Sequence, residues 1–418
     1  MLFSSMALAD KTVVVGVSGG IAAYKAAELV RLLRKQEAEV HVMMTRAARE
    51  FIAPLTLQTL SGHPVMTDLF DLTQESEIGH IRLADDADLV IVAPATADVI
   101  ARMAAGMADD PVTTVALATR ARVLLAPAMN VNMWEHPLTR RNVDALGATG
   151  RFFTIGPGAG ELACGWVGTG RMVEPPEIVL AAQRALATQD LAGRRVLVSA
   201  GPTWEPLDPV RYLGNRSSGK MGYALARAAA LRGAQVTLVS GPVALVAPPG
   251  VERIAVERAD EMRAALLERF KAHDVVVMAA AVADYRPATP SDRKLGKRKT
   301  PTGEVSLRIE LTQNPDILAE MGAERRDGKP LLVGFAAETV RGDAELLAAA
   351  RAKLAAKKCD LLVANNVAEK GAGFSVDTNR VVLVAAGGGE PTTIGPAQKD
   401  QVADAIWDRL REMMPHAG

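Results

Sequence analysis

The stretch TVVVGVSGGIAAYKAAELVRLLR, residues 12–34, decides the fold of the first half of the chain. Its β-branched run at residues 12–17 predicts a strand, Ser18, Gly19 and Gly20 predict a tight turn, and helical apolar spacing follows over residues 21–34. Strand, glycine turn and helix in this order form the first unit of a doubly wound sheet. The turn does not match GxGxxG, so a dinucleotide fingerprint is weak. A mononucleotide phosphate at the helix start and a bare tight turn both remain open.

The alternation of strands and helices continues outward from this unit. We expect strands at residues 40–45, 89–92 and 123–126, and helices near residues 54–60 and at residues 97–105. Interleaved strands and helices indicate a parallel sheet whose binding rim lies at the carboxyl ends of the strands. Two loops at that rim, APATAD at residues 93–98 and PAMNVNMW at residues 127–134, place polar side chains where a ligand would lie.

Composition limits the class of protein. A chain of 418 residues is too long for one ordinary core, so we expect two domains of about 200 residues. Lys plus Arg and Asp plus Glu are 48 each, which gives no bias toward nucleic acid or membranes. The two cysteines, Cys164 and Cys359, fit a reducing cytosol. Neither a signal peptide nor an apolar run of about 18 residues is visible, so the sequence predicts a soluble, cytoplasmic α/β protein.

A second α/β alternation follows the first. Residues 188–193 are predicted as a linker, and a new series of strands is expected at residues 195–200, 235–240, 275–280, 331–335, 360–364 and 380–385, before an amphipathic helix at residues 401–413. The fold class predicted is therefore α/β, with two successive doubly wound, Rossmann-like domains at residues 1–190 and 191–418, of which the first is flavodoxin-like.

The loop LGNRSSGKMG, residues 213–222, matches the GxxxxGK part of a nucleotide P-loop. The next position is Met221, where a P-loop needs a Ser or Thr hydroxyl for the magnesium of the nucleotide. A long connection also separates this loop from the preceding strand. We therefore reject the P-loop interpretation and expect a polar loop that opens the helix Lys220–Leu231 and holds another anion on free N–H groups.

Two single residues stand out in the first half. His80 lies in SEIGHIRLA, where a lone histidine is more often a capping or solvated residue than a functional one. Cys164 lies in a glycine-dense stretch, residues 156–172, of the kind that forms mobile flaps. A buried structural cysteine is the alternative. On the residues alone, both roles stay open.

Four motifs together carry a family resemblance. SGGIAAYK at residues 18–25, the histidine of GHIRLA, PAMNxxMW at residues 127–134 and LACGxxGxGRM at residues 162–172 resemble the flavin-dependent cysteine decarboxylases. With the second half included, the whole chain is similar to the bifunctional phosphopantothenoylcysteine decarboxylase/phosphopantothenate–cysteine ligases of coenzyme A biosynthesis. Four motifs in order are specific, whereas any one of them alone would be weak.

The resemblance implies a bound FMN in the first half, with contacts from Ser18, Gly19, Gly20, Thr45 and Thr96. Oxidation of the substrate thiol to a thioaldehyde would place an electron sink β to the carboxylate, so that CO2 can leave. The same flavin would then reduce the product, and no nicotinamide is needed. The resemblance also implies three roles: His80 as the base, Asn130 as the ligand of the substrate carboxylate, and Cys164 as the proton donor.

The second half resembles a ligase that activates 4′-phosphopantothenate with CTP as an acyl-cytidylate, from which the amine of L-cysteine displaces CMP. Lysines and Mg²⁺ would neutralise the phosphates, and the protein ligands of Mg²⁺ stay unknown. Asn215 would hold the acyl-cytidylate with Arg211 nearby, and Lys294 would contact the triphosphate. The further residues implied for CTP are Ala279, Ala280, Ala281, Asp284, Asn314, Pro315, Asp316, Ile317, Phe335, Lys353 and Lys357, and those for the substrate phosphate are Ser217, Ser218, Gly219 and Lys220.

Two features qualify this assignment. Lys353 and Lys357 share one helical face, which on spacing alone is more often solvated surface. Many bacterial relatives carry a KxKK-like cluster, whereas this chain has Gly296 between Lys294 and Lys297. We interpret the change as a more flexible lid with one charge fewer, and either lysine could be the main phosphate contact. The resemblance also implies a homo-oligomer, a dodecamer built from trimers of the decarboxylase and dimers of the ligase.

Three other functions would require features that this sequence lacks or would leave features unused. A nicotinamide-dependent oxidoreductase needs GxGxxG with an acidic residue about 20 positions later, and neither half shows it. A non-catalytic flavoprotein that regulates a partner would be expected to lack one of His80, Asn130 and Cys164, and all three are present. A decarboxylase of peptide C-terminal cysteines would not need the attached ligase-like half. We therefore expect small-molecule substrates and no nucleic-acid or membrane partner.

Overall fold

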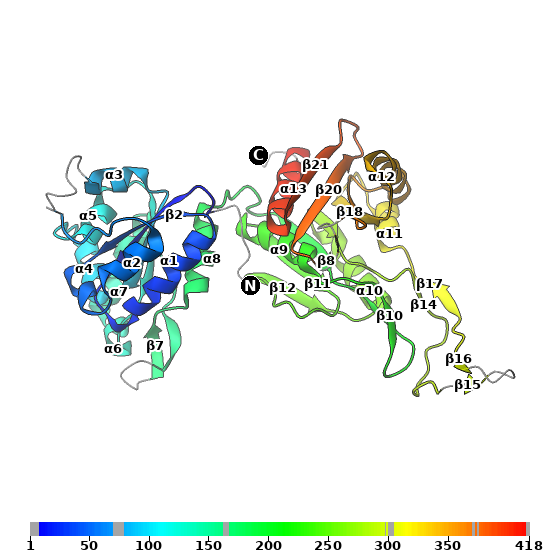
Figure 1. Cartoon of the computed structure of the whole chain (residues 1–418), viewed down its shortest axis with the longest axis horizontal. Helices are drawn as coiled ribbons and strands as arrows, with labels where there is room; N and C mark the ends of the chain where they lie inside the picture. The colour runs from blue at the N-terminus through cyan, green and yellow to red at the C-terminus, as the bar shows by residue number, and fades with distance from the viewer. Residues whose placement is uncertain are drawn as a thin grey trace. The chain divides into compact units, whose positions relative to one another are not determined.

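The computed structural model describes residues 8–69, 79–161, 167–296, 298–299, 305–369, 373 and 376–414. The chain forms two compact units, Met1–Ala187 and Thr188–Gly418, and each contains its own central sheet (Figure 1).

The first unit is built on a five-stranded parallel sheet in the order β2-β1-β3-β4-β5. The chain begins on β1, moves outward to β2, and then crosses β1 to reach β3, so the order reverses beside β1. Ligands of doubly wound sheets bind at such a switch point. The strands are β1 (Thr12–Val17), β2 (Glu39–Met44), β3 (Leu89–Ala95), β4 (Arg122–Pro127) and β5 (Phe152–Thr154).

Helices cover both faces of this sheet, because the strands are apolar on both sides. On β1, Val13, Val15 and Val17 join one core and Val14 joins the other. Helices α1 and α8 contribute to the first core, and α4 and α5 to the second. The order and the two-sided covering give a flavodoxin-like fold, as the sequence predicted. The helices are η2 (Ile21–Tyr24), α1 (Lys25–Lys35), η3 (Arg46–Glu50), α2 (Pro54–Ser61), α3 (Gly79–Asp86), α4 (Ala97–Ala104), α5 (Pro111–Ala118), α6 (Val131–Glu135), α7 (Pro137–Ala148) and α8 (Pro175–Leu186).

The second unit contains an eight-stranded sheet in the order β12-β11-β8-β13-β18-β19-β20-β21. Six strands are parallel, and the last two continue as antiparallel neighbours. The sequence predicted neither β12 nor β21, nor the reversal at β20. No crossover helix is found in the described part of the connection from β19 to β20, and a parallel neighbour would need one. The strands are β8 (Arg195–Ala200), β11 (Gln235–Ser240), β12 (Val251–Ala255), β13 (Val275–Met278), β18 (Leu331–Glu338), β19 (Leu361–Asn366), β20 (Thr378–Ala385) and β21 (Thr392–Gln398).

Helices α9 and α13 pack on one face of this sheet, and α10, α11 and α12 pack on the other. Trp407 joins the first layer: it is fully buried, and its Nε1 donates to the Leu225 carbonyl at 3.0 Å. The helices are α9 (Lys220–Leu231), α10 (Ala259–Arg269), η4 (Phe270–Ala272), α11 (Ile317–Glu324), α12 (Asp343–Lys357) and α13 (Lys399–Met413). Three antiparallel pairs extend from the unit: β9 (Trp204–Pro206) with β10 (Tyr212–Gly214), β14 (Tyr285–Pro287) with β17 (Leu311–Gln313), and β15 (Arg298–Lys299) with β16 (Val305–Ser306).

Three local predictions need correction. The predicted helix at residues 21–34 begins with the 3-10 turn η2 before α1. The connection between β8 and the Lys220 loop contains the β9–β10 pair, in which the rings of Trp204 and Tyr212 stack at 4.3 Å. The predicted linker is anchored to the second unit: Leu191 is fully buried and Gln189 Nε2 donates to the Leu231 carbonyl at 2.9 Å.

Within the described ranges, no helix is both long enough and apolar enough to cross a membrane.

Two candidate active sites

The first unit has a cavity of about 1320 Å³ at the carboxyl ends of its strands. Its lining brings together every residue predicted to contact flavin and the residue predicted to hold the substrate carboxylate: Ser18, Gly19, Gly20, Thr45, Thr96 and Asn130. These residues follow β1, β2, β3 and β4, so the sheet order itself gathers them.

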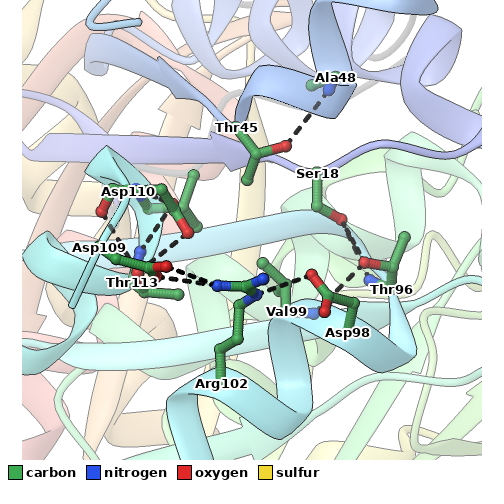
Figure 2. A network of polar contacts seen from close by, with 11 residues as sticks. Ser18, Thr45, Ala48, Thr96, Asp98, Val99, Arg102, Asp109, Asp110 and Thr113 are labelled. Atoms are coloured by element: carbon green, nitrogen blue, oxygen red, sulfur yellow. Dashed lines mark hydrogen bonds and ion pairs between the residues drawn. The ribbon is translucent and has the colours of Figure 1, made fainter. Parts of the chain in front are cut away.

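Three hydroxyl side chains of this cavity are fixed by backbone hydrogen bonds (Figure 2). Ser18 Oγ donates to the Pro94 carbonyl at 2.7 Å and accepts from Thr96 N at 3.1 Å. Thr45 Oγ1 caps η3 by accepting from Ala48 N at 3.2 Å, and Thr96 caps α4. Turns that begin helices present free N–H groups, so this wall is suited to an anionic group.

Gly19 is required by close packing rather than by an unusual backbone angle. A Cβ at this position would lie 2.4 Å from Ala47 Cβ and 2.8 Å from the Ala47 carbonyl carbon. The turn after β1 therefore packs directly against the turn after β2. This contact explains why position 19 is glycine, which the sequence pattern alone did not explain.

Charged residues at the cavity were not predicted. Arg102 bridges two carboxylates, with Nε 2.9 Å from Asp98 Oδ2 and Nη1 2.7 Å from Asp109 Oδ2 (Figure 2). Lys25 is buried, and its Nζ donates to Glu174 Oε1 at 2.8 Å, which lowers the pKa of that carboxyl. The Asp98–Arg102 spacing of four was readable in the sequence, whereas the pairing of Lys25 with Glu174 arises only from the fold.

An antiparallel hairpin, β6 (Gly158–Glu161) with β7 (Val167–Arg171), reaches the same cavity. Met129 N donates to the Gly170 carbonyl at 2.9 Å, and a Cβ on Gly170 would lie 2.4 Å from the Met129 carbonyl oxygen. The base of the hairpin is thus held against the Asn130 loop. Cys164 lies in the connection of this hairpin, outside the described residues.

His80 lies on α3 and is half-buried. The residues that line the first cavity do not include it. The fold therefore brings Asn130 to the flavin-type residues and leaves His80 of the same chain outside the cavity.

The second unit has a cavity of about 470 Å³. It gathers all the residues predicted for the ligase except Arg211 and Lys294: Asn215, Ser217, Ser218, Gly219, Lys220, Ala279, Ala280, Ala281, Asp284, Asn314, Pro315, Asp316, Ile317, Phe335, Lys353 and Lys357. The segments come from five different places in the chain, and the carboxyl edge of the sheet brings them together.

Amide side chains join the loops around this cavity. Asn215 Nδ2 donates to the Val282 carbonyl at 2.9 Å, and Asn314 Nδ2 donates to the Ala283 carbonyl at 2.7 Å. The backbone of Ala283 is held in turn by the fully buried Thr203, whose Oγ1 accepts its N–H at 3.0 Å. The loop at residues 279–284 is therefore fixed from both sides.

Three lysines of the cavity are paired with carboxylates. Lys353 Nζ lies 2.6 Å from Glu338 Oε1, Lys357 pairs with Asp316, and Lys220 Nζ lies 2.6 Å from Asp377 Oδ1. Phosphate oxygens could replace these carboxylates as partners, because both present acceptor oxygens of the same charge sign. Lys353 and Lys357 thus face the cavity and are not simply solvated surface.

Lys399 is a cavity residue that the sequence did not indicate. It is 7% exposed, and its Nζ donates to the carbonyls of Gly373, at 3.3 Å, and Val376. Burial, with a smaller effect of nearby Lys220, lowers the pKa of Lys399 to about 8. An anion that enters the cavity would stabilise the charged form of this buried ammonium group.

Arg211 and Lys294 do not line this cavity within the described residues. Asp208, whose side chain is fully buried, accepts from Arg211 Nε at 2.9 Å and from Leu295 N at 3.0 Å. Arg211 Nη2 also donates to the Leu295 carbonyl at 2.7 Å. The hydrogen bonds that Asp208 accepts, above all from the Arg211 side chain, hold the pKa of Asp208 far below the usual range. Asp208 and Arg211 form a clasp on the segment that carries Lys294, while Lys297 lies outside the described residues.

Comparison with known proteins gives the same division of the chain. The flavoprotein family model matches residues 3–186, and the model described as the DNA/pantothenate metabolism flavoprotein C-terminal domain matches residues 191–414. The coenzyme A biosynthesis bifunctional protein CoaBC of Vibrio cholerae is 49% identical over 407 residues, which is 97% of this chain and 99% of that protein. The chain belongs to the CoaBC family.

A second CoaBC sequence gives the same result. CoaBC of Escherichia coli K12 is 49% identical over 379 residues, 90% of this chain and 91% of its own. A crystal structure of the C-terminal domain of CoaBC aligns with 54% of this chain and 98% of its own at 37% identity, with a TM-score of 0.44. The family membership, the α/β fold class and the bifunctional role in coenzyme A biosynthesis predicted from the sequence are confirmed.

Proposed function

We propose that the second unit joins 4′-phosphopantothenate to L-cysteine with CTP, and that the first unit decarboxylates the product to 4′-phosphopantetheine. The observation that carries this proposal is that each cavity gathers most of one predicted residue set: the flavin residues with Asn130 in the first unit, and all the ligase residues except Arg211 and Lys294 in the second. CoaBC membership supports it. We assign residues 1–190 to the decarboxylase and residues 191–418 to the ligase.

FMN fits the residues of the first cavity. Ser18, Thr45 and Thr96 present hydroxyls at three turns, and Gly19 and Gly20 line the same wall, where the turn before η2 would hold a phosphate. Ile21 and Met133 are exposed apolar side chains in the lining and suit a flat ring system. When bound, FMN would accept two electrons from the substrate thiol and return them after CO2 has left.

The residues of the chain would position the substrate and move its protons. Asn130 caps α6 by accepting from Asn132 N at 2.9 Å, which fixes its side chain at the cavity wall where it can bind the substrate carboxylate. His80 takes the proton from the substrate thiol, and Cys164 protonates the carbon that has lost CO2. The hairpin that carries Cys164 meets the cavity at Gly170, Arg171 and Met172.

His80 does not line the cavity of its own chain, so we infer that it serves the cavity of a neighbouring copy. The homo-oligomer implied by the family resemblance supplies such a neighbour. A symmetric assembly would repeat the same exchange at every cavity.

In the second cavity, Asn215 would hold the acyl-cytidylate, and the loop at residues 279–284 would contact the nucleotide. Lys353, Lys357 and Lys294 would neutralise its phosphates together with Mg²⁺. Ser217, Ser218, Gly219 and Lys220 would hold the phosphate of the acyl substrate at the start of α9. The clasp of Asp208 and Arg211 would set the position of the Lys294 segment.

The direct test is to incubate the purified protein with 4′-phosphopantothenate, L-cysteine, Mg²⁺ and each nucleotide in turn, and to follow products by mass spectrometry. We expect a yellow protein that makes 4′-phosphopantetheine and CMP only with CTP. Supplied phosphopantothenoylcysteine separates the two activities: its decarboxylation without CMP formation would refute the ligase assignment alone. The Cys164→Ser variant should accumulate the oxidised, decarboxylated enethiol.

A further inference from the structure

A cluster of metal-binding side chains lies on the first unit, away from both cavities. Glu39 and His41 are two residues apart on β2, so their side chains share one face of this edge strand. The segment after α2 runs parallel to β2, with Met66 bridging Met43. His63 lies three residues before Met66, and its side chain reaches Glu39 on β2.

The three side chains converge. His63 Nε2 lies 2.5 Å from Glu39 Oε1, and the rings of His41 and His63 are 4.4 Å apart between centroids. The nearest candidate ligand atoms of the three residues all lie within 4.8 Å of one another, and all three residues are half-buried. Neither cavity is lined by any of them. Glu39 and His41 lie toward the amino end of β2, about 20 Å and about 13 Å along the strand from Thr45 at about 3.3 Å per residue.

Neighbouring residues form hydrogen bonds that orient Glu39 and His63, as residues behind the ligands of a metal site do. Arg34 Nη1 donates to Glu39 Oε2 at 3.1 Å and leaves Oε1 directed at His63. Ser61 is fully buried, and its Oγ donates to the His63 carbonyl at 3.1 Å and accepts the His63 N–H at 3.2 Å. A carboxylate oriented by a second group and a histidine with a fixed backbone are features that raise metal affinity.

We propose that Glu39, His41 and His63 bind one divalent transition-metal ion of the zinc class. Two imidazoles and one carboxylate are the ligands such ions prefer, whereas Mg²⁺ and Ca²⁺ prefer oxygen alone. With metal–ligand distances of about 2.0–2.2 Å, the three ligand atoms need only side-chain rotations to close around the ion, and the Glu39–His63 hydrogen bond opens. The ion ties the edge strand to the segment after α2. This site is independent of the proposed catalytic function.

The test is calorimetric titration of the flavin-loaded, chelator-treated full-length protein with ZnCl2. We expect the wild type to bind one more equivalent of zinc than the His41→Ala/His63→Ala double variant, and zinc to raise Tm only in the wild type. Arg34→Gln should weaken this equivalent by about 10- to 100-fold. The control His136→Gln removes an exposed helix-capping histidine outside the cluster and should bind like the wild type.

Equal zinc stoichiometry in the wild type and the double variant would overturn the proposal. So would competition by equimolar Mg²⁺, because an oxygen-preferring ion does not displace zinc from imidazoles. Far-UV and flavin spectra of the variants establish that they are folded, which the half-exposed positions of the three side chains lead us to expect.

Discussion

Lys399 carries a buried ammonium group at the second cavity, and its pKa of about 8 lies below the ordinary value of 10.5. Lys399 therefore binds its proton more tightly in the unfolded chain than in the folded protein. Because the unfolded chain holds more protons between about pH 8 and pH 10.5, the free energy of unfolding of the ligand-free protein should rise with pH over this range. An anion beside Lys399 would raise this pKa again. CTP binding at about pH 8.5 should consequently take up protons.

Proton uptake is measured by titrating CTP in buffers with different heats of ionisation. Lys399→Met should lose most of the uptake and bind CTP more weakly, whereas Lys271→Met, an exposed residue paired with Glu324, should behave as the wild type. Undiminished uptake in Lys399→Met would show that this lysine does not face the phosphates.

Asp208 holds the Lys294 segment through Arg211 and Leu295, so we expect the loss of its charge to affect the ligase reaction and not the decarboxylase reaction. Asp208→Asn should lower the ligase rate by up to about 100-fold, because displacement of a group by about 1 Å can cost that much. Flavin content and decarboxylation of supplied phosphopantothenoylcysteine should not change. CMP release is the measurement, and Asp327→Asn at an exposed turn is the control.

The low pKa of Asp208 also has a consequence for stability. Because the folded pKa lies below the unfolded one, the contribution of Asp208 is complete above the unfolded pKa of about 3.9 and is lost as the pH falls through the folded value. Thermal unfolding of the wild type and of Asp208→Asn should therefore converge in strong acid. A constant difference in Tm at all pH values would contradict this.

At the scale of elements, the contact between the turns after β1 and β2 shapes the first cavity. Gly19→Ala places a methyl group 2.4 Å from Ala47 Cβ, so one turn must move and flavin retention should fall. Gly147→Ala, in α7 with no atom within 4 Å of the added methyl group, should raise stability by about 0.4–1 kcal/mol. The absorbance of flavin per mole of purified protein and Tm distinguish the two. Full flavin content in Gly19→Ala would refute the argument.

Elements with a strong local pattern were predictable, and those that depend on distant contacts were not. Helix α9 was predicted with its observed bounds, since its apolar spacing begins directly after Gly219. Strand β21, with the sequence TTIGPAQ, contains Gly395 and Pro396 and is largely exposed, so no local signal marked it. β21 pairs antiparallel with β20, and α13 begins with Lys399 directly after β21. The position of β21 in the sheet therefore places Lys399 at the cavity. That lysine could not be assigned to the site without the fold.

At the scale of the whole molecule, the proposed role of His80 in a neighbouring copy predicts that the decarboxylase depends on its assembly. Chains with His80→Gln and chains with Asn130→Asp should each be inactive. Asp at position 130 can keep the helix cap but repels a carboxylate. In co-expressed mixtures, half of the cavities keep Asn130 and half of their neighbours keep His80, so we expect about a quarter of the wild-type activity. A mixture as inactive as either variant would place His80 in the cavity of its own chain.

The anchored segment after Ala187 determines where this polypeptide could be divided into two genes. A ligase polypeptide that starts at Thr188 keeps Leu191 in its core, and Arg232 keeps its bond from Nε to Asp190 Oδ1 at 2.8 Å. One that starts at Arg194 uncovers that apolar surface and leaves Arg232, whose side chain is 10% exposed, with Asp408 as its remaining carboxylate partner. We therefore expect a division into two genes to preserve the folded ligase unit when it falls before Thr188, and to destabilise that unit when it falls after Gly193.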